Sequence, residues 1–388
     1  MPLAGLIICS DEGGGAGGAL PALLPVAGQT LIEYQVRLAR HAGAAHIVVL
    51  IDHMPSALVA AFDRLRADNI DIDIARDARD AADRIHPDEQ LLVLASGAVA
   101  AREIIGAIAA SPTPVLLTVD DVPAHQHFER IDAKARWSGI ALIDGKLLRA
   151  TSAILGDWAL APTLLRTAVQ GGAKQQAIAV GAQVALLSDQ GGAQAFSNNL
   201  ARGIQKPNGG WITRTLIAPL ARRITPLLLA KDVPLDLIVA LPMVLVGSGL
   251  LLAMTGWLGA AFGLFLLAGV PAAMATIMTS IGARESSLLA LFDRFHLPSA
   301  CLILLVSGWM LSGGGQAWGV IALAAWAGSL MLLMNPGRAE KSWYADADTL
   351  GATMLVAIML GQPVVGMAVV IAHGLATRID ERGSGQII

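Results

Sequence analysis

Cysteine is nearly absent from this 388-residue chain, which has only Cys9 and Cys301. Two isolated thiols can form neither a disulfide framework nor a thiolate metal cluster, so both are expected to be inert packing residues. Charge is also scarce, at 15% of the residues, and it is absent altogether between Leu237 and Ala283. Up to Asp236, charged residues recur every few positions. This step in composition predicts a water-exposed domain joined to a membrane domain.

The start of the chain lacks the features of a secretory signal. The stretch MPLAGLIICSDE has no basic segment before its apolar run, and that run is too short for a signal peptide. We therefore expect the first half of the chain to lie in the cytoplasm. The net charge of −3 and the pI near 6.2 argue against nucleic acid as the main partner, because phosphate contacts need a basic face.

Six apolar segments in the second half predict an all-α transmembrane domain, although several are shorter than the ~20 residues that span a bilayer. They cover residues 235–255, 258–280, 297–311, 318–334, 350–361 and 364–377. Three of the connections carry no charge, whereas the two between them carry Arg284, Arg294, Arg338 and Lys341. By the positive-inside rule, the charged connections and both termini are predicted to be cytoplasmic.

The stretch 210–232, immediately before the first apolar segment, has the pattern of an amphipathic helix. Apolar residues recur at helical spacing and basic residues lie between them. The apolar residues are Ile212, Leu216, Leu220, Ile224 and Leu227. The basic residues are Arg214, Arg222, Arg223 and Lys231. Such a helix is expected to lie in the membrane interface. It is either a simple anchor, stabilised by buried apolar surface and anionic lipid heads, or part of a substrate site.

A basic juxtamembrane helix, six spans and an Ala-Arg pair at the cytoplasmic end of the second span resemble the CDP-alcohol phosphatidyltransferases. The motif of that family has two aspartates and a glycine before the Ala-Arg pair, and a glycine and two further aspartates after it. The resemblance implies carboxylates that hold Mg or Mn on a diphosphate, and one that accepts the proton of an attacking hydroxyl. The equivalent positions are Thr276, Thr279, Ser280, Ala283, Arg284, Asp293, Leu297 and Cys301.

Only the Ala-Arg pair of this motif is present, and the four aspartate positions hold two threonines, a leucine and a cysteine. Neutral hydroxyls cannot replace four negative charges around two hard cations. We therefore expect Thr276, Thr279 and Ser280 to pack or to hydrogen-bond between helices.

Other ionisable residues lie on the predicted cytoplasmic side. Four acids are candidates for a rearranged metal site, the alternative being that they are solvated loop charges: Glu285, Asp293, Asp346 and Asp348. His296 and His373 lie near cytoplasmic ends of spans, where a neutral histidine costs little, so neither is assigned a catalytic role.

The first 190 residues predict an α/β domain with a mainly parallel sheet. A strand, a glycine-rich loop, a proline turn, a helix and a second strand open it, and the runs LLVLA and PVLLTV alternate with helical patterns further on. A tight loop from strand to helix can hold phosphate on backbone NH groups. The candidate nucleotide-loop residues are Gly13, Gly14, Gly15, Gly17 and Gly18.

The run ALLPVAGQTLIEYQVRLARHAGAAHIVVL resembles the first unit of sugar-phosphate nucleotidyltransferases, which have a Rossmann-like fold. A fusion of both families resembles the bifunctional inositol-phosphate cytidylyltransferase/phosphatidyltransferase proteins. That resemblance implies a basic residue in the glycine loop, a lysine before the LLPVAG turn and a metal-binding aspartate after LLVLA. The chain has no Lys or Arg before Arg37, and Ser96 to Ala98 stand where the aspartate is expected. Asp120 and Asp121 are either a cation site or a turn at the end of a strand.

Together these patterns predict a nucleotidyltransferase-like domain at 1–190, a linker and juxtamembrane helix at 191–234, and a six-span domain at 235–388. Because both implied sites lack their charges, the leading hypothesis is a membrane pseudoenzyme that acts as a binding or partner subunit. Its expected partners are the lipid membrane, a second copy or an intact relative, and a nucleotide or CDP-alcohol. The alternatives are an active CDP-alcohol phosphotransferase with Mg or Mn in a rearranged site, and a membrane-tethered nucleotidyltransferase.

Overall fold

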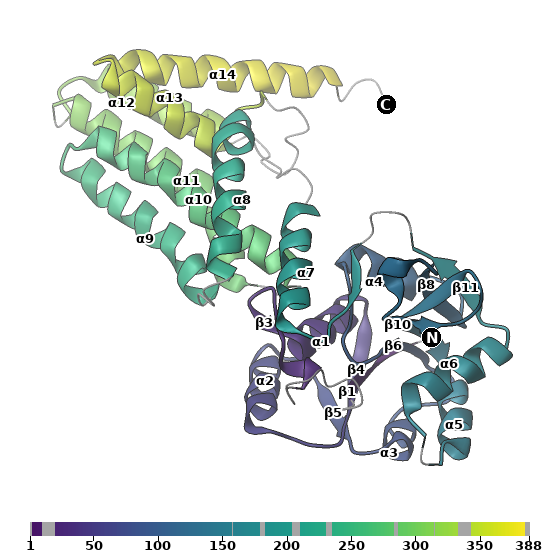
Figure 1. The fold of residues 1–388 in the computed structure, drawn as a ribbon. Helices are drawn as coiled ribbons and strands as arrows, with labels where there is room; N and C mark the ends of the chain where they lie inside the picture. Colours follow the sequence, from purple (N-terminus) through teal and green to yellow (C-terminus); the bar gives the residue numbers. More distant parts are fainter. Residues whose placement is uncertain are drawn as a thin grey trace. The chain divides into compact units, whose positions relative to one another are not determined.

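The structure, a computed structural model, describes residues 2–9, 20–156, 158–178, 183–203, 210–229, 235–282, 286–313, 315–332 and 343–384. These residues form two units (Figure 1): an α/β unit that covers the chain up to Gly203 and also includes the described residues Ser280 to Gly282, and a helical unit that covers the other described residues.

An eight-stranded sheet forms the centre of the α/β unit, in the order β11-β8-β10-β6-β1-β4-β5 with β9 paired to β10. The strands are β1 (Leu3–Cys9), β4 (Ala44–Ile51), β5 (Ile72–Ala75), β6 (Gln90–Leu94), β8 (Val115–Asp120), β9 (Glu129–Arg130), β10 (Ala135–Asp144) and β11 (Lys174–Ala177). The pairs β1–β4, β1–β6, β4–β5 and β8–β11 are parallel, and β10 runs antiparallel to β6, β8 and β9. The predicted mainly parallel sheet is confirmed.

The central strands are apolar along their whole length because both of their faces are covered. Residues Ala4 to Cys9 of β1 are all buried, as are Leu91 to Leu94 of β6. Strands buried on both sides have continuous apolar runs in place of alternation, which is how the run LLVLA shows in the sequence. Two small sheets add to the unit: β2 (Pro25–Val26) with β3 (Gln29–Thr30), and β7 (Ala98–Ala100) with β12 (Val184–Leu186).

Seven α-helices lie in the described part of the α/β unit (Figure 1). They are α1 (Leu31–His41), α2 (Ser56–Ala67), α3 (Ala78–Asp83), α4 (Arg102–Ala109), α5 (Gly145–Ile154), α6 (Leu160–Gln170) and α7 (Gln190–Gly203), with 3-10 turns η2 (Pro21–Leu23) and η3 (Pro123–His125). Helix α1 begins with a capping box, in which the side chains of Thr30 and Glu33 bind each other's backbone NH groups. It packs on β1 and β4.

In its described stretches, the helical unit begins with a juxtamembrane helix and continues with six apolar helices. The juxtamembrane helix consists of a π-helical turn, η4 (Thr213–Ile217), and α8 (Ala218–Leu229). The six helices are α9 (Leu235–Met254), α10 (Leu258–Ile281), α11 (Ser287–Leu311), α12 (Trp318–Leu332), α13 (Ala347–Met359) and α14 (Pro363–Ser384).

Four of the six helices are long and apolar enough to cross a membrane: α9, α10, α11 and the stretch Pro363–Asp380 of α14. Helices α12 and α13 are apolar but shorter. The predicted membrane domain is therefore supported by four candidate spans, and six spans remain a prediction. The third helix also begins at Ser287, earlier than the apolar run at 297–311 indicates. Its first turns carry Asp293 and Arg294, which lowered the hydropathy there without ending the helix.

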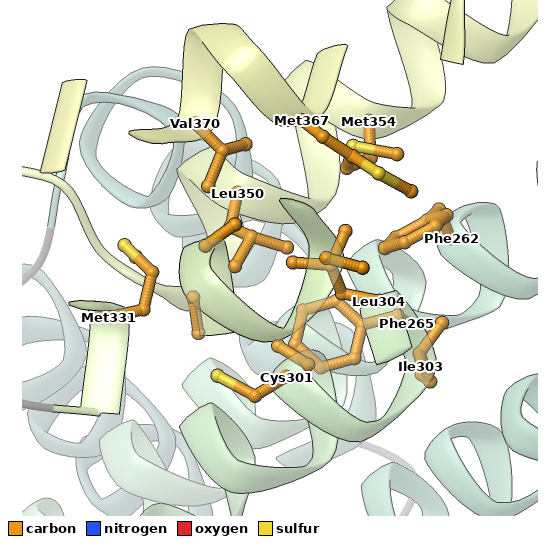
Figure 2. Close-up of a cluster of buried hydrophobic side chains, with 14 of the residues drawn as sticks. Phe262, Phe265, Cys301, Ile303, Leu304, Met331, Leu350, Met354, Met367 and Val370 are labelled. Carbon is orange, nitrogen blue, oxygen red and sulfur yellow. The ribbon is translucent and has the colours of Figure 1, made fainter. Parts of the chain in front are cut away.

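Among the described residues, the core of the helical unit joins six helices, α9 to α14, with Ala253 contributed by α9. Figure 2 shows its largest side chains converging: Phe262, Phe265, Cys301, Ile303, Leu304, Met331, Leu350, Met354, Met367 and Val370. Small residues bring the helix backbones close together. A Cβ atom added at Gly308 would lie 2.5 Å from the Cβ of Ala324, and one added at Gly366 would lie 2.5 Å from the Cβ of Ala357.

Candidate functional site: a polar cluster in the helical unit

The two threonines at implied aspartate positions on α10 use their hydroxyl groups within their own helix. Thr276 Oγ1 donates to the carbonyl of Ala272 at 2.9 Å, and Thr279 Oγ1 donates to the carbonyl of Ala275 at 2.9 Å. Ser280 lies half-buried in the same helix. Ala283 and Arg284 lie outside the described residues. The predicted hydrogen bonds of the threonines are thus made, but along α10 and not between helices.

The three implied positions on α11 differ in their surroundings. Asp293 is exposed, Leu297 packs against the apolar core, and Cys301 is buried. The Cys301 thiol donates to the carbonyl of Gly328 on α12 at 3.5 Å. Leu297 and Cys301 therefore contribute to helix packing, and their positions offer no ligand for a hard cation.

A different set of polar side chains does converge in this unit, and we call Thr213, His296, Asp346 and Asp348 the polar cluster. Its centre is Asp348 in the first turn of α13, which is only 8% exposed. One carboxylate oxygen of Asp348 accepts from Thr213 Oγ1 at 2.6 Å, and the other accepts from His296 Nε2 at 3.1 Å. These bonds link the juxtamembrane helix, α11 and α13.

Asp346 is the N-cap of α13 and is held by the juxtamembrane helix as well. Its carboxylate accepts from the backbone NH of Thr349 at 2.8 Å and from the Thr349 hydroxyl, as a helix N-cap does. The other oxygen accepts from the NH of Gly210 at 2.6 Å and lies 3.5 Å from Thr213 Oγ1. Asp346 and Asp348 thus share Thr213 as a partner.

The imidazole of His296 lies between aromatic rings. It stacks on Phe265 of α10 with ring centroids 4.6 Å apart and planes 10° apart, and it contacts Phe292 of α11 at 4.8 Å. The bond to Asp348 places a proton on Nε2 and leaves Nδ1 as the second polar atom. In the described part of the chain, this buried Nδ1 has no hydrogen-bond partner. A buried nitrogen without a partner marks a place where water or a ligand atom can bind.

The segment before α13 is fixed to α14, which sets the position of both acids. The Tyr344 hydroxyl donates to Asp380 at 2.8 Å, and the NH of Ala345 donates to Thr377 Oγ1 at 3.0 Å. His373 Nε2 donates to the carbonyl of Trp343 at 2.7 Å. His373 is therefore engaged in packing this segment.

The rearranged metal site stays a prediction. Glu285 lies outside the described residues, Asp293 is exposed, and the oxygens of Asp346 and Asp348 already accept hydrogen bonds. No group of three or more His, Cys, Asp or Glu side chains able to hold a metal occurs within the described ranges.

In the α/β unit, the five candidate loop glycines, Gly13, Gly14, Gly15, Gly17 and Gly18, lie outside the described residues. The site of the expected metal-binding aspartate is described, and Gly97 lies there with a φ of +77°. A Cβ atom at this position would lie 2.5 Å from the carbonyl oxygen of Leu187. The NH of Leu187 also donates to the Gly97 carbonyl at 2.8 Å. The backbone at Leu187 thus occupies the space that a side chain at residue 97 would need.

The other candidate cation site, Asp120 and Asp121, carries positive charge of its own. The Asp121 carboxylate accepts from Arg136 Nε at 2.5 Å and pairs with Arg130 Nη2 at 2.7 Å. The hydrogen bond from Arg136 and the charge of Arg130 hold the pKa of Asp121 below its ordinary value. Asp120 is exposed at the end of β8. A cation bound here would be repelled by the guanidinium groups of Arg130 and Arg136. This favours the interpretation that Asp120 and Asp121 form a turn at the end of a strand over the cation site.

A buried ionic network around Glu33 was not foreseen from the sequence. Glu33 is 2% exposed and binds Arg64 through two bonds of 2.9 Å, while Arg37 lies 3.7 Å from Glu33 and 2.6 Å from Asp68. Burial raises the pKa of Glu33, but the bonds from Arg64 and Thr30 outweigh it and hold the pKa below its ordinary value. The pattern Thr30-x-x-Glu33 was the available signal, since it is typical of a capping box.

Comparisons with known proteins leave the family open: no protein-family model matches the chain, and no curated protein matches it significantly.

Proposed function

We propose that this chain is an integral membrane binding protein that has the scaffold of the CDP-alcohol phosphatidyltransferases and does not carry out their transfer reaction. The proposal depends on one observation: the hydroxyls of Thr276 and Thr279 donate hydrogen bonds to carbonyls of their own helix. A diphosphate and two divalent cations need several carboxylates in one place. Two satisfied hydroxyls supply none of that charge.

The same reasoning extends to the α/β unit, which we propose to be a binding domain without nucleotidyl transfer. Gly97 has no room for a side chain, so a metal-binding aspartate at this position would require a different backbone. In this proposal the α/β unit and both termini are cytoplasmic. The bound molecule is a CDP-alcohol or nucleotide held without turnover, and the chain pairs with a second copy or with an intact relative.

The test is an activity measurement on the purified full-length protein in lipid vesicles. With Mg²⁺ or Mn²⁺ and labelled CDP-diacylglycerol or CDP-inositol, we expect no release of CMP. We expect CDP-diacylglycerol to raise the melting temperature more than diacylglycerol does, because only the former carries the nucleotide. If neither lipid shifts the melting temperature and the chain is repeatedly isolated alone, the binding proposal is wrong.

A second candidate function is an active phosphotransferase, and the pair His296–Asp348 favours it. A carboxylate 3.1 Å from an imidazole can orient a general base, and Nδ1 of His296 is free to accept a proton within the described structure. CMP release that persists in Asp236→Asn but is lost in Asp348→Asn would establish this function, because Asp236 is an exposed acid on α9. Pyrophosphate release from CTP would instead indicate a nucleotidyltransferase.

A further inference from the structure

The juxtamembrane helix has one face turned away from the helical unit, and that face combines leucines with arginines. Leu216, Leu220 and Leu227 are 61%, 45% and 64% exposed. Arg222 and Arg223 are exposed as well. The opposite face is buried, with Ile217, Ala221 and Thr225 at 5%, 0% and 0%.

The exposed residues of α8 form one stripe. Leu220, Arg223 and Leu227 are spaced i, i+3 and i+7, which places them along the same side of an α-helix. Arg223 therefore lies between two leucines, and Arg222 borders the stripe. Long arginine side chains can lay their methylene groups on such leucines while the guanidinium reaches a polar layer.

The buried side of the juxtamembrane helix is already occupied by this unit's own residues. A Cβ atom added at Gly269 of α10 would lie 2.7 Å from the side chain of Ile217, so the helix approaches α10 at a position that only glycine allows. Thr213 is bonded to Asp348 of α13. The stripe is thus the face left for an external partner.

The charge of the stripe is uncompensated within the structure. Residues 210–229 include three arginines and no acidic residue. Across the described parts of the chain, neither Arg222 nor Arg223 has an ion pair or a side-chain hydrogen bond. In contrast, Arg37, Arg64 and Arg136 each bind a carboxylate.

Only one environment suits both kinds of side chain. Water would leave three large leucine side chains hydrated at a free-energy cost. Hydrocarbon would exclude two guanidinium groups that have no counter-ion. The interface of a bilayer accepts the leucines among the acyl chains and the arginines among the lipid phosphates. Trp211, which is 56% exposed at the start of this helix, is also typical of that layer.

We infer that the stripe of Leu216, Leu220, Arg223 and Leu227, together with the bordering Arg222, is a recognition surface for anionic glycerophospholipids of the surrounding bilayer. The two arginines bind headgroup phosphates, and the leucines lie against the acyl chains. The site is separate from the polar cluster, so the inference does not depend on what that cluster binds.

The test compares lipid retention by full-length protein purified in neutral detergent and stripped of native lipid. Phosphatidylglycerol or phosphatidylcholine is titrated in, and bound lipid is counted by native mass spectrometry. We expect a preference for phosphatidylglycerol that falls about tenfold or more in the double variant Arg222→Gln/Arg223→Gln, since each basic residue contributes to attraction at an anionic surface. The variant Arg222→Lys/Arg223→Lys should keep most of the preference.

The matched control is Arg79→Gln/Arg102→Gln, which removes the same charge from exposed arginines of α3 and α4. It should retain phosphatidylglycerol as the unmodified protein does, and added glycerol 3-phosphate should not displace the lipid. Circular dichroism checks that each variant is folded. Equal retention of both lipids by the unmodified protein would overturn the inference. So would an unchanged lipid preference in the Gln variant together with a loss of dimers, which would assign the stripe to a second copy of the chain.

Discussion

Within the described residues, each unit of this protein buries one carboxylate, and the two carboxylates are satisfied in different ways. Glu33 in the α/β unit is 2% exposed and binds Arg64 and Thr30, with Arg37 nearby. Asp348 in the helical unit is 8% exposed and binds a hydroxyl and an imidazole. The first has permanent cations as partners, and the second has groups that are neutral or only conditionally charged.

The difference follows from what each unit can bury. Arg64 is half exposed, so its guanidinium remains partly hydrated while it neutralises Glu33. Among apolar helices a guanidinium would need hydration that is not available, whereas Thr213 and His296 donate hydrogen bonds at a smaller desolvation cost. The comparison predicts that removing the carboxylate is more damaging in the α/β unit than in the helical unit.

The largest effect is expected for Glu33→Ala. The substitution removes the buried acceptor of Arg64 and the α1 capping box, while Arg37 keeps Asp68 as its partner, so we expect a loss of about 3 kcal/mol in the free energy of unfolding of the α/β unit. We expect a loss at the lower end of the range for breaking a buried ion pair, because water can solvate the half-exposed Arg64 once Glu33 is gone. Hydrogen–deuterium exchange of β1 and α1 peptides in the full-length protein measures the loss. The control Asp63→Asn breaks an exposed pair with Arg66 and should cost below about 1 kcal/mol.

A smaller effect is expected for Asp348→Ala. It leaves the Thr213 hydroxyl and His296 Nε2 without their acceptor, and we expect a loss of about 1 to 2 kcal/mol, the range for buried hydrogen bonds between membrane helices. Exchange of amides in 213–229 and at the start of α13 should rise, while β1 peptides are unchanged. The exposed Asp293→Asn serves as control. A loss in Asp348→Ala that equals or exceeds that in Glu33→Ala would contradict the comparison.

The smallest expected effect is a difference in acid sensitivity. Because the folded-state pKa of Glu33 lies below its ordinary value, its stabilisation is present above about pH 4.3, the unfolded-state value, and is lost as the pH falls through the folded pKa. Between pH 7 and about pH 3.5, the α/β unit should therefore lose less stability in Glu33→Gln than in the unmodified protein. Exchange rates of α1 at both pH values, corrected for intrinsic exchange, give the comparison. Equal losses would show that Glu33 does not contribute to the acid sensitivity.

Much of the secondary structure could be predicted because it depends on local pattern. The runs LLVLA and PVLLTV became β6 and β8, and the apolar segments mark the six helices of the second half. The predicted start of the third apolar segment, at residue 297, lies about three turns after the observed start of α11 at Ser287. The helix continues through Asp293 and Arg294, where the hydropathy falls. Hydropathy reports where a segment can be buried, not where its hydrogen bonds end.

The candidate site was much less predictable. His296 was expected to be an unremarkable interfacial residue, and Asp346 and Asp348 were expected either to form a metal site or to be solvated. The structure joins them to Thr213, which is 135 positions away from Asp348 in the chain. No local pattern carries this information, because the pairing depends on how the juxtamembrane helix, α11 and α13 pack.

The sequence by itself determined the division into an α/β half and an apolar helical half, and the absence of aspartate at Thr276, Thr279, Leu297 and Cys301. Composition and residue identity are properties of the chain that folding does not alter. Only the tertiary structure decided which polar groups satisfy one another, and that Leu187 fills the space beside Gly97. Burial raises the free-energy cost of every unpaired polar atom, so the partners are chosen by the packing that brings distant segments together.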